Sequence, residues 1–216
     1  MAEATLNKNM IEGQIKPING MSEELLSTFY SLDRNDFMPE AMKQMSYVEK
    51  NIILQNKRTI LKPSLIAQIA LSINLKAHEN VLILGATTGY LSAILSYQAE
   101  TVIVVEENDS LLNSSENAIK KNNINNVVFI KNEIAKGYNE QSPFNAIIIE
   151  GAIQEVPGNI LNQLDEGGRL FAIVQDEEIC SAKLFIKNGN SISEQKLFNC
   201  TMPVLNMFMK KNSFSF

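Results

Sequence analysis

The sequence predicts a doubly wound α/β fold with a mostly parallel sheet, because short apolar runs alternate with helical patterns from residue 81 onward. The first run, residues 81–84, contains only Val, Leu and Ile, which is typical of a strand buried on both faces. A glycine-bounded turn, residues 85–89, follows it and leads into a helical pattern. Near the end of the chain no helical pattern separates the apolar runs, so we expect an antiparallel edge there.

We expect one domain, residues 1–216, in which a helical N-terminal cap (residues 1–75) covers a sheet core (residues 76–216). In the cap, Ser22 can accept a hydrogen bond at the start of a helix. Pro63 precedes another periodic segment, and proline suits the first turn of a helix. The expected cap helices cover residues 22–29, 41–45 and 65–73.

The core is expected to alternate strands and helices. Predicted strands cover residues 81–84, 102–105, 127–130, 146–149 and 168–174, and predicted helices cover residues 90–97, a segment that opens at Asp109, and residues 160–164. The final strands are predicted at residues 183–187, 191–193 and 204–209, the first two joined by a turn at residues 188–190.

The charge balance argues against nucleic acid as a partner. The chain has 19 Lys and Arg residues against 24 Asp and Glu, a formal net charge of −5, which opposes the phosphate backbone. No apolar stretch approaches the roughly 18 residues that a membrane span needs. The polar start, residues 1–9, does not look like a secretory signal. We therefore expect neither nucleic acid nor a membrane as a partner.

The content of cysteine and histidine argues against a metal site. Cys180, Cys200 and the single His78 are too few for a His- or Cys-based metal centre, so we expect no metal. Both thiols are expected to be reduced and structural. Together with the absence of a signal, this favours the cytoplasm.

The turn after the first predicted strand is the candidate ligand site. Its glycines permit backbone angles that a side chain forbids, and the N–H groups that open the next helix point at the turn. Such a corner suits a ligand with a carboxylate, a phosphate or a ribose, and we expect binding by Gly85, Ala86, Thr87, Gly89 and Tyr90. Because the turn is not the G-x-G-x-x-G of dinucleotide binders, a plain strand-to-helix turn is the alternative.

Four carboxylates stand where parallel strands should end. Glu106, with Glu107 beside it, ends the second strand of the core, where a carboxylate can accept hydrogen bonds from both hydroxyls of a ribose. Glu133 and Glu150 follow the next two strands. Since ligands bind beyond the carboxyl ends of the strands in such a sheet, the acids could line one crevice for a cationic ligand that contains adenosine. The alternative for each is an ordinary exposed acid.

Several short segments are spread over most of the chain: residues 10–16, 37–41, 59–60, 81–90, 137–138, 156–157 and 163–170, together with Pro63. Among them Gln14, residues 37–40 and the Gly-Gly-Arg-Leu at residues 167–170 are specific in combination. This pattern resembles the protein-L-isoaspartate O-methyltransferase family, which belongs to the S-adenosylmethionine-dependent methyltransferases. The resemblance implies a Rossmann-like sheet of seven strands and S-adenosyl-L-methionine as the methyl donor.

The resemblance also implies roles for particular residues. The donor would lie over the glycine turn, Glu106 would hold its ribose, and Glu133 would reach its adenine. The implied substrate is an isoaspartyl residue in a damaged protein or peptide, whose free carboxylate attacks the donor's methyl group. A carboxylate is already ionised at neutral pH, so alignment and desolvation are the main contributions expected of the protein.

On the substrate side, the chain departs from the family's pattern at one hydroxyl. Leu61 stands where the family has the serine thought to meet the substrate carboxylate. Thr59 and Ser64 are the candidates to compensate for it. The preceding segment, residues 55–58, also lacks a glycine that the family often has there.

On the donor side, Ile83 replaces an acid of the family's pattern and Thr87 replaces a glycine. These departures motivate a second hypothesis, a non-catalytic binding or regulatory protein that keeps the fold. A nicotinamide dehydrogenase is a weaker third interpretation. The turn lacks a third glycine, and no His, Cys or Tyr-Lys pair is placed for hydride chemistry.

Overall fold

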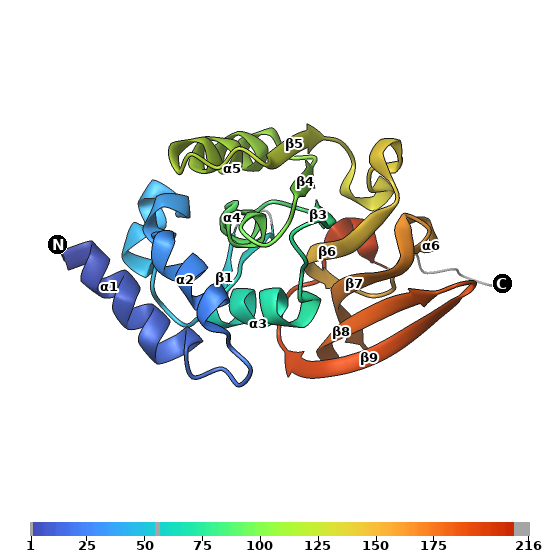
Figure 1. Cartoon of the computed structure of the whole chain (residues 1–216), viewed down its shortest axis with the longest axis horizontal. Helices are drawn as coiled ribbons and strands as arrows, with labels where there is room; N and C mark the ends of the chain where they lie inside the picture. The colour runs from blue at the N-terminus through green and yellow to red at the C-terminus, as the bar shows by residue number, and fades with distance from the viewer. Residues whose placement is uncertain (1, 55–56, 210–216) are drawn as a thin grey trace.

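A sheet of seven strands runs through the middle of the molecule, with helices on both faces (Figure 1). The computed structural model describes residues 2–54 and 57–209. Within this part of the chain the strands of the sheet are β3 (Asn80–Leu84), β4 (Thr101–Glu106), β5 (Val127–Lys131), β6 (Phe144–Ile153), β7 (Leu164–Asp176), β8 (Ile179–Asn188) and β9 (Ser191–Cys200).

The strand order, β5-β4-β3-β6-β7-β8-β9, is that of a doubly wound sheet. From β3 the chain extends the sheet first through β4 and β5 and then, on the other side, through β6 and β7, with parallel pairing throughout. The last two strands pair antiparallel, and a tight turn connects β8 to β9. The predicted fold class and its antiparallel edge are therefore confirmed.

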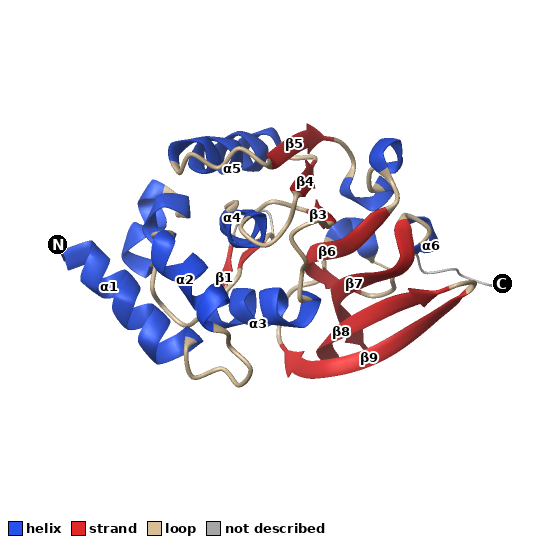
Figure 2. Cartoon of the chain, viewed as in Figure 1, coloured by secondary structure: helices blue, strands red, loops and turns tan. Residues whose placement is uncertain are grey.

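The two faces of the sheet are covered unequally, as Figure 2 shows. On one face lie α3 (Pro63–Ile73), α4 (Tyr90–Ser96) and α5 (Asp109–Lys121), and on the other lie α6 (Gly158–Leu161) and short 3₁₀ helices. Alternate residues of a strand point to opposite faces. Val81 and Ile83 belong to the first core, and Leu82 and Leu84 to the second. Burial on both sides explains the unbroken apolar run of β3.

The N-terminal region is mainly helical and packs beyond α3 and α4 (Figure 1). It contains α1 (Ala2–Met10), a π-helix (Ile11–Ile15), α2 (Glu23–Ser31) and 3₁₀ helices at Arg34–Phe37 and Glu40–Met45. Ser22 caps α2 as predicted, because its hydroxyl accepts the N–H of Leu25 at 3.1 Å. The prediction missed an antiparallel hairpin of β1 (Ile52–Ile53) and β2 (Thr59–Ile60), whose two-residue strands are too short to show periodicity.

Two predicted elements near the C-terminus are wrong in extent or type. The helix predicted at residues 160–164 is instead α6, which ends at Leu161, because β7 already begins at Leu164. The strand predicted at residues 204–209 is instead a 3₁₀ helix, Asn206–Phe208. Strand-like pairing is limited to one parallel bridge between Val204 and Ala152 of β6. Leu205 and Phe208 are buried in the second core, so most of this apolar run reflects packing against the sheet.

Two negative findings hold for residues 2–54 and 57–209. None of their helices has the length and apolar character needed to cross a membrane, and no three of their His, Cys, Asp or Glu residues are grouped so as to hold a metal ion. The free thiols Cys180 and Cys200 occupy facing positions on β8 and β9. Burial raises the pKa of the Cys200 thiol to about 11, which disfavours its reactive thiolate form.

Arg169, from the Gly-Gly-Arg-Leu segment, ties β7 to α3 and β3. Its guanidinium donates to Glu79 Oε1 at 2.9 Å and Oε2 at 2.7 Å, and to the main-chain oxygens of Ile73 and Asn74. Burial alone would raise the pKa of Glu79. The hydrogen bonds from Arg169 and the Lys76 N–H outweigh burial, so the pKa of Glu79 is below its ordinary value.

Glu79→Gln should lower the free energy of unfolding at about pH 7 by about 1–3 kcal/mol, because a neutral amide cannot replace the charge-assisted pair. A carboxyl whose pKa is depressed by folding contributes stability above its unfolded pKa, near 4.3, and loses it as the pH falls through the folded value. The difference, measured by urea denaturation, should therefore shrink at about pH 3. An equal difference at both pH values would contradict the ionised pair.

Candidate active site

The turn between β3 and α4 has the left-handed backbone that its glycines predict. Gly85 has a φ of +97° and Gly89 a φ of +81°, values that disfavour side chains. Gly89 also lies close to α5, because a Cβ added to it would stand 3.2 Å from Ser115. The N–H of Gly85 donates to the main-chain oxygen of Val105 at 2.8 Å. The turn is thereby held against the end of β4.

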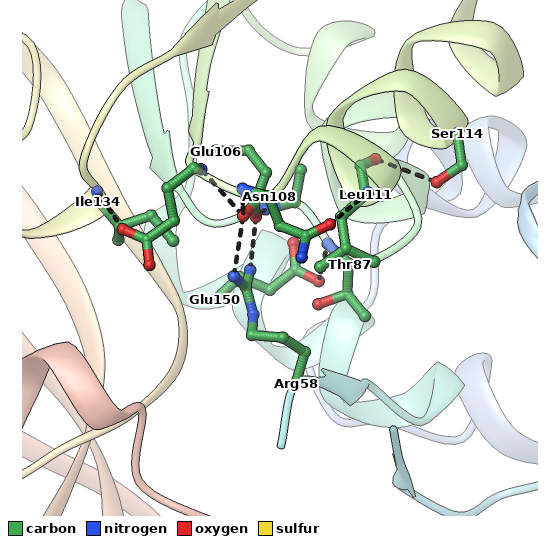
Figure 3. A network of polar contacts seen from close by, with 10 residues as sticks. Arg58, Thr87, Glu106, Asn108, Leu111, Ser114, Ile134 and Glu150 are labelled. Carbon is green, nitrogen blue, oxygen red and sulfur yellow. Dashed lines mark hydrogen bonds and ion pairs between the residues drawn. The ribbon is translucent and has the colours of Figure 1, made fainter. Parts of the chain in front are cut away.

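Glu106 is the last residue of β4 and its side chain is fully buried. Its Oε2 accepts the N–H of Ala86 at 2.8 Å, and its Oε1 accepts the N–H groups of Glu107 at 3.0 Å and Asn108 at 2.9 Å (Figure 3). Three backbone donors thus fix the carboxylate beside the glycine turn. The structure brings together the turn and the acid that the sequence analysis placed in one site.

Arg58, which precedes β2, directs its guanidinium into this site (Figure 3). Nη2 lies 2.9 Å from Glu106 Oε2 and Nη1 donates to Oε1 at 3.2 Å, with only 6% of the arginine side chain exposed. The same Nη2 lies against Gly85, where an added Cβ would stand 2.5 Å from it. A cation therefore covers the glycine surface and binds the acid at once.

Arg58 was not among the residues predicted for the site. Residues 55–58 stood out in the sequence only for a missing glycine, and residues 55–56 lie outside the described part of the chain. The available signal was an arginine between two short apolar runs, residues 52–54 and 60–61. An arginine is rarely buried unless it is paired, so a buried acid had to be sought for it.

Glu150 completes the buried cluster of charges. The prediction put it just past a strand, but it lies inside β6 at a register shift against β7 between Ile148 and Ala152, an irregularity that can redirect a side chain. Its Oε1 accepts the N–H of Thr87 at 3.4 Å. Burial raises the pKa of Glu150 to about 7, although the charge of Arg58 acts to lower it.

Glu107 and Glu133 lie on the exposed rim rather than in the cluster. Glu107 accepts the N–H of Ile134 at 3.3 Å, and Glu133 pairs with Lys136 at 2.6 Å. A groove of about 440 Å³ opens beside Glu107. It is lined by the charged residues Lys57, Arg58, Glu106 and Glu107 and by the apolar residues Leu205 and Met207, among others. The groove gives the charge cluster a route to solvent.

The other predicted side chains have different surroundings. Thr59 is 3% exposed, and its hydroxyl has no hydrogen-bond partner among the described residues. The hydroxyl of Ser64 donates to Glu49. The ring of Tyr90 is fully buried with the guanidinium carbon of Arg34 5.1 Å from its centroid, so this ring supports α4 from the cap side and only its backbone borders the turn.

The two apolar departures from the family's pattern both strengthen the core. Ile83 is completely buried and Leu61 is 2% exposed, and both belong to the core beneath the cap. The carbonyl of Leu61 accepts a hydrogen bond from Arg34 Nη2 at 2.6 Å. Neither side chain therefore supplies a polar group to the donor or the substrate.

Comparison with known proteins identifies the family. Residues 5–206 match the model of the family described as protein-L-isoaspartate(D-aspartate) O-methyltransferase. The chain belongs to this family. A protein-L-isoaspartate O-methyltransferase from Vibrio campbellii is 32% identical over 161 residues, 74% of this chain and 77% of that protein. One from Methanoculleus marisnigri is 24% identical over 202 residues, 93% of this chain and 92% of that protein.

One solved structure has the same fold as this chain. It is a protein-L-isoaspartate O-methyltransferase from Plasmodium falciparum in complex with S-adenosyl-L-homocysteine, with a TM-score of 0.77 and 22% identity. The alignment covers 94% of this chain and 97% of that one. The family is S-adenosylmethionine-dependent, and S-adenosyl-L-homocysteine is that donor without its methyl group.

The polar groups of this family member suit the donor in type and position. A left-handed glycine turn and a fixed carboxylate at the end of the next strand are the features that hold an adenosine ribose in doubly wound folds. The space over the glycine turn is not open to the donor in this structure, because Arg58 covers Gly85 and pairs with Glu106. A ribose can reach this carboxylate only after the guanidinium has moved.

Glu150→Gln should gain stability relative to the wild type as the pH rises. A carboxyl whose pKa is raised by folding holds a proton in the native state between its unfolded pKa, near 4.3, and its folded pKa, about 7 for Glu150. The wild type therefore loses stability across that window, whereas a glutamine does not titrate. The difference in unfolding free energy should change by up to about 1.4 kcal/mol per pH unit. Urea denaturation at about pH 5 and about pH 8 measures it.

The matched control for this measurement is Glu155→Gln, an exposed position shortly after β6. It should change stability little at either pH, as surface substitutions generally do. A Glu150→Gln difference that is the same at both pH values would show that folding does not raise the pKa of this carboxyl.

Proposed function

We propose that this chain is an active S-adenosylmethionine-dependent methyltransferase that methylates the free carboxylate of isoaspartyl residues in damaged proteins or peptides. The observation that carries the proposal is the family match over residues 5–206, which includes both the glycine turn and Glu106. The similar proteins from Vibrio campbellii and Methanoculleus marisnigri bear the name of this activity. No observation on the described residues favours the non-catalytic alternative over it.

In this proposal the protein acts by holding and aligning its ligands. Glu106, fixed by three backbone N–H groups, accepts hydrogen bonds from the donor's ribose, and the backbone of Gly85 allows the close approach that a side chain would prevent. The donor supplies the methyl group. Because the substrate carboxylate is ionised at neutral pH, no side chain is needed to remove a proton from it.

We assign the hydroxyl that faces the substrate to Thr59 rather than Ser64. The Thr59 hydroxyl is buried beside Arg58 in sequence and is without a hydrogen-bond partner among the described residues, whereas Glu49 engages the hydroxyl of Ser64. A buried hydroxyl of this kind favours a ligand that supplies the missing hydrogen bond. Thr59 thus takes the place of the serine hydroxyl that the chain lacks at Leu61.

The proposed partner is a protein or peptide, which reaches the site through the groove beside Glu107. The net charge of −5 disfavours nucleic acid as an alternative partner. We place the protein in the cytoplasm, and the free thiols of Cys180 and Cys200 support this location, since oxidising compartments favour disulfides.

The purified protein should transfer a labelled methyl group from S-adenosylmethionine to a synthetic peptide that contains one isoaspartyl residue, and not to the same peptide with aspartate. Glu106→Gln should lower kcat/KM for the donor at least about tenfold, because an amide that is both donor and acceptor replaces a charged acceptor. Circular dichroism checks that the variant is folded.

Glu116→Gln, on the exposed side of α5 where Glu116 pairs with Lys120 at 2.7 Å, is the matched control and should retain the wild-type rate. If neither the wild type nor the control transferred a methyl group, the proposed activity would be wrong. The second hypothesis, a binding protein with the methyltransferase fold, would then replace it.

A further inference from the structure

We propose that Arg58 competes with the methyl donor for Glu106 and for the surface of Gly85, and thereby sets the affinity of the pocket for the donor. The inference rests on the proposed function, since it concerns the same donor site. It goes beyond that function because it assigns to Arg58 a role in excluding the donor rather than in binding it.

Arg58 occupies acceptor sites on the Glu106 carboxylate that a ribose would need. An ionised carboxylate offers about four lone-pair sites. Glu106 Oε1 already receives the N–H groups of Glu107 and Asn108 and Nη1 of Arg58, and Oε2 receives the N–H of Ala86 and faces Nη2 of Arg58. The backbone donors are fixed by the fold, so only the arginine can give up its place.

The second argument is steric. Gly85 has no side chain, and Arg58 Nη2 fills the space in which a Cβ would stand, at 2.5 Å from it. Close approach of a ligand to the backbone is the reason for a glycine in such a turn. In this structure the group that approaches the backbone closely is the guanidinium of Arg58.

The third argument is that the site is built to keep a cation. The side chain of Glu106 is fully buried and Glu150 is 5% exposed, so two carboxylates lie in the interior beside the turn. Removing one partner of a buried pair leaves an uncompensated charge. The planar guanidinium also matches the two oxygens of a carboxylate better than an ammonium group does. Breaking the pair between Arg58 and Glu106 therefore costs free energy, and this cost lowers the affinity of the pocket for the donor.

Calorimetry with S-adenosyl-L-homocysteine as the probe tests this competition. Arg58→Gln should bind the probe at least about tenfold more tightly than the wild type, a gain of about 1.4 kcal/mol. Lys50→Gln is the matched control, because it removes the same charge from an exposed position that does not line the groove. Its affinity should stay within about twofold of the wild type.

Arg58→Gln leaves Glu106 and Glu150 without their cation, so a second comparison guards against misfolding. Arg58→Gln combined with Glu150→Gln removes one buried carboxyl together with the guanidinium, and it should bind the probe at least about tenfold more tightly than Glu150→Gln alone. Thermal denaturation shows which variants are folded. If neither arginine variant binds more tightly than its parent, the competition does not exist.

The outcomes separate this inference from the proposed function. If the wild type binds the probe and methylates the isoaspartyl peptide, but Arg58→Gln binds no more tightly, the inference is wrong and the function stands. If Arg58→Gln binds more tightly but no variant methylates the peptide, the competition stands and the function is wrong. If no folded variant binds the probe, both are wrong.

Discussion

The buried ion pair between Arg58 and Glu106 is the constraint on which the site depends. Taking two charges out of water costs several kcal/mol per ion, so such a pair persists only where other groups complete its hydrogen bonding. Here the N–H groups of Ala86, Glu107 and Asn108 do so. The pair joins the β1–β2 hairpin of the N-terminal region to the point where the strand order of the sheet reverses. The candidate site is therefore formed by residues of both the cap and the sheet.

The residues that match the family and those that depart from it serve different purposes in this molecule. Arg169, a matching residue, holds β7 against the end of α3 through the main-chain oxygen of Ile73 and against the start of β3 through Glu79. Gln163, another, accepts the N–H of Tyr138 at 2.8 Å. These contacts preserve the fold. The departure at Thr87 and the unanticipated Arg58 lie instead around Gly85, where the ligand should bind. The matching residues therefore stabilise the fold, whereas Thr87 and Arg58 lie at the candidate ligand site.

Much of this was readable from the sequence, and the omissions have physical causes. The apolar run before Gly85 and the position of Glu106 predicted a site that the structure brings together, because both follow from the topology of a parallel sheet. Arg58 was missed because its partner is 48 residues away and its hairpin is too short to show periodicity. The strand predicted at residues 204–209 was wrong because the segment pairs with the sheet only at Val204, and its other apolar residues are buried by packing.

The donor pocket proposed for this methyltransferase family member is the space that the guanidinium of Arg58 occupies. The most direct measurement is a crystal structure of the wild-type protein grown with S-adenosyl-L-homocysteine. We expect electron density for the ribose against Gly85, with its hydroxyls on Glu106 and the guanidinium of Arg58 withdrawn from both. Density for the ligand at that turn with Arg58 still paired to Glu106 would contradict it, as would a ligand bound elsewhere on the sheet.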